Sequence, residues 1–293
     1  MAITADDVEL FEASRQRLEA IAYRLLGSAA EAEDAVQEAF LRWQAADRGR
    51  IEVPQAWLTK VLTNQCLNQL GSARARRETY VGQWLPEPLL AGDPMLGPAD
   101  TAEQRESVSL AVLHLMERLS PVERGVYVLR EAFDYPYDRI AEILESTVVA
   151  ARQLVSRARK HVESGRTASV GVPAQRRLLE AFLTAARRGD TVTLEQLFAA
   201  EVVSRTDGNG VKLAARIPVV GRARVAKFIA AFASHFWIGK TIDWVVVNGQ
   251  PAAAVREDGV VTTLVTLTAS DAGIDQLMWV MSPDKLRHVA PAS

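Results

Sequence analysis

Two stretches of this 293-residue chain are too rich in small residues and proline to continue a helix or a strand. Residues 82–100 hold four prolines and three glycines in nineteen positions, and residues 164–173 form a second such break. Proline fixes φ and removes an amide donor, so regular elements end where such residues gather. The sequence therefore predicts three folded units, at residues 1–81, 101–163 and 174–293, joined by two linkers.

Charge is unevenly distributed along the chain. In total 34 Lys and Arg residues face 36 Asp and Glu residues, which gives a formal net charge of −2. Up to residue 165 there are 19 basic and 25 acidic residues, and after it 15 basic and 11 acidic. This balance argues against a uniformly basic nucleic-acid-binding surface, but it leaves room for local basic clusters.

Three further features indicate a cytoplasmic protein. The lone Cys66 excludes an intramolecular disulfide and a cysteine-cluster metal site, as is typical of a reducing compartment. The longest apolar run, Phe228 to Ala233, is far shorter than the ~20 residues of a membrane-spanning helix. The start of the chain is acidic, whereas a secretory signal begins with basic residues.

Hydrophobic periodicity separates the first two units from the third. The first two show helical spacing, with a helix ending at Gly27, a second capped by Ser28 and a third beginning at Pro54. The third unit begins with helices at about 174–188 and 222–236 and then becomes rich in Val, Thr and Trp. There, Asn248-Gly249, Asp258-Gly259 and Ala272-Gly273 are hairpin signals. We expect an all-α half followed by an α+β domain.

The segment Tyr137–Val162 combines a short apolar helix, a polar break and a basic helix, which is the plan of a helix-turn-helix. The alternative is an ordinary amphipathic helix with a solvated basic face. The short preceding helix and the lack of acids between Glu145 and Glu163 favour DNA binding. Arginine and glutamine can read base edges in a major groove, and further cations pair with phosphates. The candidate DNA-binding residues are Arg152, Gln153, Ser156, Arg157, Arg159 and Lys160.

The helix that begins at Pro54 carries a weaker signal of the same kind. Asn64 and Asn68 lie four residues apart, opposite an apolar ridge, and Arg74, Arg76 and Arg77 follow at its end. Two amides and terminal arginines can read bases and hold phosphates, although exposed Asn and Arg at a helix end are common.

These motifs, taken in order, resemble a known family. Glu31–Arg42, then Trp57-Leu58-Thr59 leading to Asn64 and Asn68, then the helix-turn-helix, are similar to a sigma factor of the extracytoplasmic-function (ECF) group. The resemblance covers about residues 6–163. It implies two all-α domains: sigma domain 2, a helical bundle, and sigma domain 4, which contains the helix-turn-helix.

The resemblance also implies partners and residue roles. The partners would be the β′ and β subunits of core RNA polymerase and promoter DNA. Asn64 and Asn68 would contact the −10 element, the loop at about 45–53 would take a flipped-out base, and the basic helix would enter the −35 major groove. The linker would thread towards the polymerase active site. The residues that would dock on the β′ coiled coil are Asp34, Gln37, Glu38 and Leu41.

Three short motifs resemble signatures of the ECF subgroup with a fused SnoaL-like, or NTF2-like, C-terminal domain. They are Trp84–Pro88, Asp207–Gly210 and Pro283–Leu286. The subgroup usually has a third glycine where this chain has Asn209, and an Asn where it has Ser282. Asn tolerates left-handed backbone, so we expect the turn to be kept. The residues that would regulate the sigma domains in cis are Trp84, Pro86, Asp207, Gly208, Gly210, Pro283, Asp284 and Lys285.

The resemblance implies that the third unit is an α+β cone around an apolar pocket, which could hold an unidentified small molecule. Its tryptophans Trp237, Trp244 and Trp279 fit a core or a pocket wall better than a cofactor site. No acid–base spacing, phosphate-binding loop or metal-ligand cluster is evident, so we expect no catalytic residue, cofactor or metal. The acid–base candidates that we considered are Asp207, His235, Asp243 and Asp275.

Three functions remain open at this point. The favoured one is a promoter-specificity subunit regulated in cis by its C-terminal domain. The second is a one-component helix-turn-helix regulator with a ligand-sensing domain, which would leave the motifs at 34–41 and 64–68 unexplained. The third is an enzyme with incidental helical domains, which the missing acid–base constellation disfavours.

Overall fold

The computed structural model divides the chain into two compact units. The first comprises Met1–Glu78 and Gly92–Gly165, and the second comprises Thr79–Ala91 and Arg166–Ser293. The structure describes residues 3–78, 80–166 and 169–289, except for the side chains of residues 73–78 and 288.

The first three helices begin and end where local capping chemistry predicts. Thr4 and Asp7 form a capping box at the start of α1, and Gly27 ends this helix with a φ of 71°. The Ser28 side chain accepts a hydrogen bond from Glu31 N and caps α2, and Pro54 begins α3. The bounds are α1 Ala5–Leu26, α2 Ala29–Ala45, the 3₁₀ helix η1 Arg48–Arg50 and α3 Pro54–Glu78.

The rest of the first unit consists of short helices and the helix-turn-helix. Glu145, with a φ of 51°, lies in the turn, and the Thr147 side chain caps the second helix. Ala151, Val155 and Ala158 are buried, which confirms the predicted inner seam. The bounds are η2 Pro94–Leu96, α4 Ala102–Ser107, α5 Leu110–Met116, α6 Pro121–Tyr127, the π-helix η3 Val128–Ala132, α7 Tyr137–Ile143 and α8 Val148–Ser164.

Cys66 on α3 is completely buried, and burial raises the pKa of its thiol. The thiolate is the reactive form of cysteine, so the folded protein should be nearly inert to 5,5′-dithiobis(2-nitrobenzoate). We expect labelling of the native chain to be at least about 100-fold slower than labelling in denaturant. Rapid labelling under native conditions would contradict the buried placement of Cys66.

The second unit is built on one six-stranded sheet in the order β2-β1-β6-β5-β4-β3. β1 pairs with β6 in parallel, and all other neighbours are antiparallel. The three predicted hairpins are present, with Asn248 and Asp258 in left-handed conformations at two of the turns. The strands are β1 Phe198–Asp207, β2 Val219–Val220, β3 Thr241–Val247, β4 Gln250–Glu257, β5 Val260–Ser270 and β6 Gly273–Val280.

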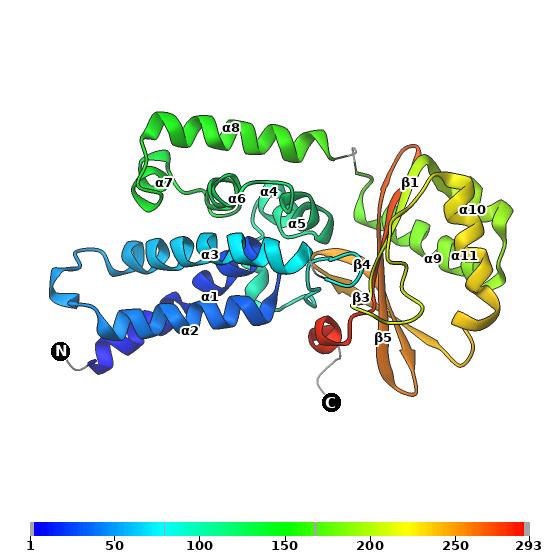
Figure 1. Cartoon of the computed structure of the whole chain (residues 1–293), viewed down its shortest axis with the longest axis horizontal. Helices are drawn as coiled ribbons and strands as arrows, with labels where there is room; N and C mark the ends of the chain where they lie inside the picture. The colour runs from blue at the N-terminus through cyan, green and yellow to red at the C-terminus, as the bar shows by residue number, and fades with distance from the viewer. Residues whose placement is uncertain (1–2, 79, 167–168, 290–293) are drawn as a thin grey trace. The chain divides into compact units, whose positions relative to one another are not determined.

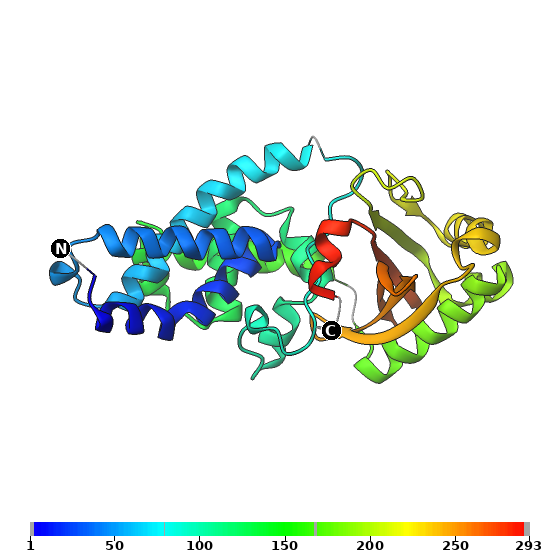
Figure 2. The same ribbon diagram turned by 90° about the horizontal axis from the view of Figure 1, so that it is seen from below.

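Helices cover one face of this sheet and bury its main core. Figures 1 and 2 show α9, α10 and α11 on one side of the sheet and the terminal 3₁₀ helix η4 on the other. Phe182 of α9 packs against Phe198 and Trp279 of the strands, with ring centroids about 6 Å apart. The helical bounds are α9 Val172–Arg188, α10 Thr191–Leu197, α11 Arg222–Phe236 and η4 Pro283–Val289.

Residues 80–91, here called the strap, belong to this second unit, although the sequence predicted a linker over residues 82–100. The strap runs beside the end of the sheet's edge strand β3. Leu89 N donates to Asn248 Oδ1, and Asn248 N donates to Leu89 O, both at 2.9 Å. Ala91 N donates to Val246 O at the same distance. Residues 92–100 lie in the first unit, so the chain is divided within the expected linker.

Among the described residues, no helix is both long and apolar enough to cross a membrane.

Candidate nucleic-acid interface and regulatory site

The second helix of the helix-turn-helix presents its predicted DNA-binding residues on one face. All six side chains named above on α8 are exposed, while the opposite face packs into the unit. Arg152 stacks 5.4 Å from the centroid of the Tyr137 ring. Arg159 pairs with Glu131 at 2.7 Å, and this hydrogen bond raises the pKa of Arg159. A phosphate would therefore have to replace Glu131 as the partner of Arg159.

Asn64 and Asn68 lie in different surroundings. Asn68 is exposed, whereas Asn64 is half-buried and donates from Nδ2 to Ile143 O of α7 at 3.2 Å. Close by, Lys60 pairs with Glu145 of the helix-turn-helix at 3.0 Å. The predicted −10 face of α3 is therefore partly occupied by the predicted −35 module. The side chains of Arg74, Arg76 and Arg77 lie outside the described residues.

The loop expected to receive a flipped-out base forms a shallow, open pocket of about 550 Å³. One wall is the ring of Trp57, which lies 5.7 Å from the Trp43 ring. An aromatic wall beside polar side chains suits the stacking of an unpaired base. The residues lining the pocket are Ala46, Asp47, Arg50, Ile51, Glu52, Val53 and Trp57.

The predicted polymerase-binding residues follow the solvent side of α2. Asp34, Gln37 and Leu41 are exposed, and Leu41 retains 49% of its accessible surface. Glu38 is half-buried and pairs with Arg42 at 3.1 Å. An exposed leucine bordered by carboxylates is a surface that a basic and apolar partner helix could cover.

Two buried arginines join the predicted domains inside the first unit. Arg124 of α6 donates from Nε and Nη2 to Arg24 O at the end of α1, at 3.2 and 3.1 Å, and it also pairs with Glu117. Burial lowers the pKa of Arg124 to about 9 and that of Arg24 to about 10. Both remain cationic at neutral pH, and the Arg124 charge complements the negative end of the α1 dipole.

Asp207 is the centre of the strap site in the second unit. It ends β1 and is completely buried, and its carboxylate accepts hydrogen bonds from three groups. Tyr80 OH donates to Oδ1 at 2.6 Å, and Leu85 N and Lys285 Nζ donate to Oδ2 at 2.7 and 2.6 Å. Lys285 also donates to Leu85 O at 2.5 Å and lies 4.2 Å from the centroid of the Trp84 ring. One buried ion pair thus holds both ends of the Tyr80–Leu85 segment.

Backbone geometry explains the glycines of the same motif. A Cβ at Gly208 would lie 2.1 Å from the Ala214 Cβ, so the 208–218 loop can fold back only with glycine there. Asn209 and Gly210 have φ of 41° and 89°, which confirms that asparagine keeps the left-handed turn.

Most of the predicted regulatory residues meet at this site. Pro86 is buried in the strap, while Pro283 and Asp284 are exposed at the start of η4, where Asp284 pairs with Arg287. Sequence reasoning missed Tyr80, and it interpreted Asn248 as a turn residue alone. Burial and the hydrogen bond to Asp207 raise the pKa of Tyr80, so its phenol stays protonated and donates. No sequence signal marks Tyr80, because its partner lies 127 residues away.

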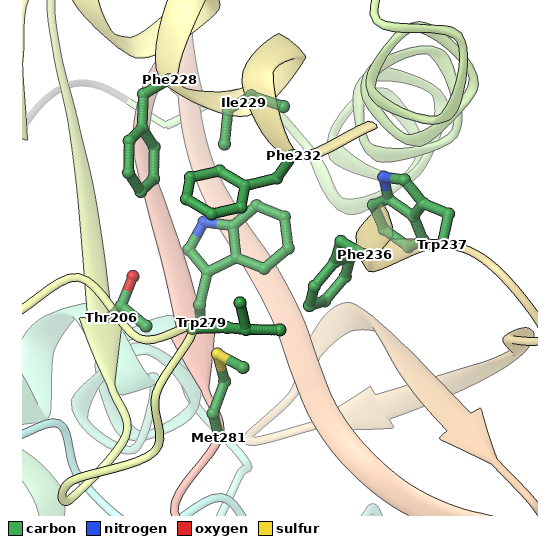
Figure 3. A pocket seen from close by; sticks show the side chains of 9 residues that line it. Thr206, Phe228, Ile229, Phe232, Phe236, Trp237, Trp279 and Met281 are labelled. Atoms are coloured by element: carbon green, nitrogen blue, oxygen red, sulfur yellow. The ribbon is translucent and has the colours of Figure 1, made fainter. Parts of the chain in front are cut away.

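An apolar pocket of about 40 Å³ lies between α11 and the sheet. Figure 3 shows Phe228, Phe232 and Phe236 of α11 around the Trp279 indole, with Thr206 and Met281 from the strand side. The Trp279 indole N–H donates to Ser204 Oγ at 3.2 Å. The pocket is lined by Thr206, Leu213, Phe228, Ile229, Phe232, Phe236, Trp237, Trp279 and Met281.

The acid–base candidates do not converge on this pocket. His235 contacts Ser234, Asp243 pairs with Arg256, and Asp275 accepts from Ser270. Within the described part of the chain, no three His, Cys, Asp or Glu residues are grouped as metal ligands.

Comparisons with known proteins agree with this arrangement. The family profile of sigma-70 region 2 matches residues 10–76, and that of sigma-70 region 4 matches residues 109–162. The chain is 36% identical over 290 residues to the ECF RNA polymerase sigma factor SigJ of Mycobacterium tuberculosis (strain ATCC 25618 / H37Rv), covering 95% of this chain and 93% of that protein. It is 33% identical over 283 residues to a probable ECF RNA polymerase sigma factor, SigI, of Mycobacterium tuberculosis (strain CDC 1551 / Oshkosh), covering 94% and 93%.

A solved structure extends the likeness to the whole architecture. The crystal structure of Mycobacterium tuberculosis extracytoplasmic function sigma factor SigJ superposes with a TM-score of 0.75 at 32% identity, covering 98% of this chain and 100% of that one. Helical sigma regions followed by a sheet domain with a SnoaL-like fold are therefore common to both. The chain belongs to the ECF RNA polymerase sigma factors, the transcription initiation factors that direct RNA polymerase to promoters.

Proposed function

We propose that this sigma factor recognises its promoters through α3 and α8, docks on the polymerase β′ coiled coil through α2, and is regulated in cis by its own sheet domain. The polymerase β subunit is a further expected contact. The observation that carries the regulatory part is the strap. The strap connects α3 to the helices that follow residue 92. The buried Asp207–Lys285 pair holds this strap on the sheet unit.

The promoter contacts follow from the exposed side chains. The basic face of α8 would enter the −35 major groove, while Asn68 and the Trp57 pocket would meet the opened −10 element. Asn64 can join them only after its hydrogen bond to Ile143 O is broken.

Replacing Arg152 by alanine should relax recognition at one −35 position and cost about 1–3 kcal/mol there. Its exposed guanidinium can bond a guanine edge bidentately, and alanine cannot. Affinities of the polymerase holoenzyme for a set of single-base −35 variants measure this effect. An equal loss of affinity for every −35 variant would instead indicate that Arg152 contacts a phosphate.

In the proposed regulation in cis, the sheet domain controls whether the strap is free to bind polymerase. In the proposed mechanism the linker must leave the sheet domain to enter polymerase, so the Asp207 site and polymerase compete for the same residues. Weakening the site should therefore favour the polymerase-bound state.

The test is run-off transcription with core polymerase, comparing Tyr80→Phe with the full-length native chain. Removal of one hydroxyl leaves the ion pair in place, and a several-fold rise in promoter-specific transcript is expected. The matched control is Arg287→Met, an exposed cation of η4 that does not reach Asp207. Equal transcript from all three proteins would refute the regulatory proposal, and promoter retention without initiation would support the one-component regulator instead.

We also propose a cytoplasmic location, where polymerase and promoters are, and a binding rather than catalytic role for the apolar pocket. None of its nine lining side chains is an acid or a base that could activate the Thr206 hydroxyl, which supports occupancy by a small molecule without turnover.

A further inference from the structure

The walls of the apolar pocket restrict the chemistry of what it can hold. Phe228, Phe232 and Phe236 come from one face of α11, and Trp279 faces them from β6. None of the nine lining side chains carries a charge, and the Thr206 hydroxyl is the one alcohol among them. Aromatic walls with no counter-ion suit a flat, neutral ring system and would penalise a buried carboxylate or sulfonate.

The pocket has a small volume in this structure. About 40 Å³ is room for roughly three water molecules, whereas ligand pockets usually measure at least about 300 Å³. Most of the wall belongs to α11, β1 and β6, which are held by backbone hydrogen bonds. Leu213 is different, because it lies in the 208–218 loop and retains 46% of its accessible surface. A ligand of two or three rings would therefore enlarge the pocket by displacing this loop.

The same loop holds the strap. Gln83 Nε2 donates to Ala215 O at 3.2 Å, and the position of a Gly82 Cβ lies 3.7 Å from the Arg216 Cα. Val81 and Gly82 also share a small cavity with Thr206, which in turn lines the apolar pocket. Asp207 follows Thr206 directly in β1, and neighbouring side chains on a strand point to opposite faces. One loop and one strand thus connect the ligand side of the sheet with the strap side.

We propose that the pocket is the effector site for a neutral, flat aromatic compound of two or three rings, whose binding displaces the 208–218 loop and loosens the strap. This inference rests on the proposed regulation in cis and adds its chemical signal. Coupling of this kind is reciprocal: a compound that weakens strap binding must itself bind more tightly when the strap is weakened.

The test uses two probes of one shape on the full-length chain. N-phenyl-1-naphthylamine is neutral, and 1-anilinonaphthalene-8-sulfonate is the same skeleton with a sulfonate. We expect saturable fluorescence enhancement with the neutral probe and at least about tenfold weaker binding of the sulfonate. Phe232→Arg should weaken the neutral probe at least about tenfold, because it places a guanidinium among the aromatic walls on α11, which the proposal leaves in place. Ala231→Arg, on the same helix but exposed and outside the pocket, is the matched control and should stay within about twofold.

The coupling is read out separately. Tyr80→Phe should bind the neutral probe about two- to fivefold more tightly, and the probe should speed amide hydrogen exchange in the described strap, residues 80–91, of the native chain. Equal affinity for the two probes, or equal loss in Phe232→Arg and Ala231→Arg, would overturn the pocket assignment. Unchanged affinity in Tyr80→Phe with unchanged exchange would overturn the coupling. Probe-free run-off transcription tests the sigma function independently, so the two proposals can fail separately.

Discussion

Replacing Lys285 by methionine is expected to lower the free energy of unfolding of the sheet unit by about 3–5 kcal/mol. Methionine keeps much of the length and apolar stem of lysine but removes the cation that neutralises Asp207. The carboxylate is completely buried, and the Lys285 side chain retains 11% of its surface, so water cannot replace the lost charge. Urea unfolding monitored by tryptophan fluorescence measures the loss, because Trp237 and Trp279 lie in this core.

Two further variants make the Lys285 prediction specific. Arg287→Met removes an exposed cation of the same short helix and should change the free energy of unfolding by less than about 0.5 kcal/mol. The double variant Asp207→Asn, Lys285→Met removes both charges and should recover part of the loss. If Lys285→Met and Arg287→Met had the same free energy of unfolding, the Asp207–Lys285 pair would not be a buried anchor of the sheet unit.

The second large effect is expected at Arg124. Changing it to methionine should cost about 3–5 kcal/mol in the helical unit, because Glu117 loses its partner and Arg24 O loses two donors in a buried place. The loss of stability should be greatest at the end of α1, where the Arg124 guanidinium donates to Arg24 O. Hydrogen exchange of the last turn of α1 measures it, and this turn should open earlier in the variant than in the native chain.

The control for Arg124 is an arginine of the same unit whose ion pair is exposed. Arg139 pairs with Glu142 at 2.7 Å on the surface of α7, and Arg139→Met should change the free energy of unfolding by less than about 1 kcal/mol. A similar small effect at Arg124 would mean that the burial of its guanidinium does not stabilise the unit.

Features that depend on neighbouring residues were predictable from the sequence. Gly27 and Ser28 end and begin helices through hydrogen bonds that reach no further than four residues. The inner seam of α8 follows from its apolar spacing, and the hairpins follow from Asn-Gly and Asp-Gly turns. The exposed basic face of α8 was predictable for the same reason, since the seam determines which face remains exposed.

Features that join distant residues were not predictable in this way. The Pro-rich stretch was interpreted as a linker because proline ends regular structure, and that reason says nothing about where the segment packs. The sequence predicted that Asn64 contacts promoter DNA. In the folded unit its amide donates a hydrogen bond to Ile143 O, 79 residues away. The apolar pocket likewise combines Leu213 of the 208–218 loop with side chains of α11, β1 and β6, which no local pattern brings together.

The sequence by itself determined the positions of the Pro- and Gly-rich breaks, the capped helices, the basic helix and the short motifs that mark an ECF sigma factor. The tertiary structure alone decided that part of the first break is a strap and that Asp207 holds it. These contacts span 122 residues from Leu85 to Asp207 and 200 from Leu85 to Lys285. A buried carboxylate must find its partners wherever the fold brings them, and only the folded chain reveals that Tyr80, Leu85 and Lys285 are those partners.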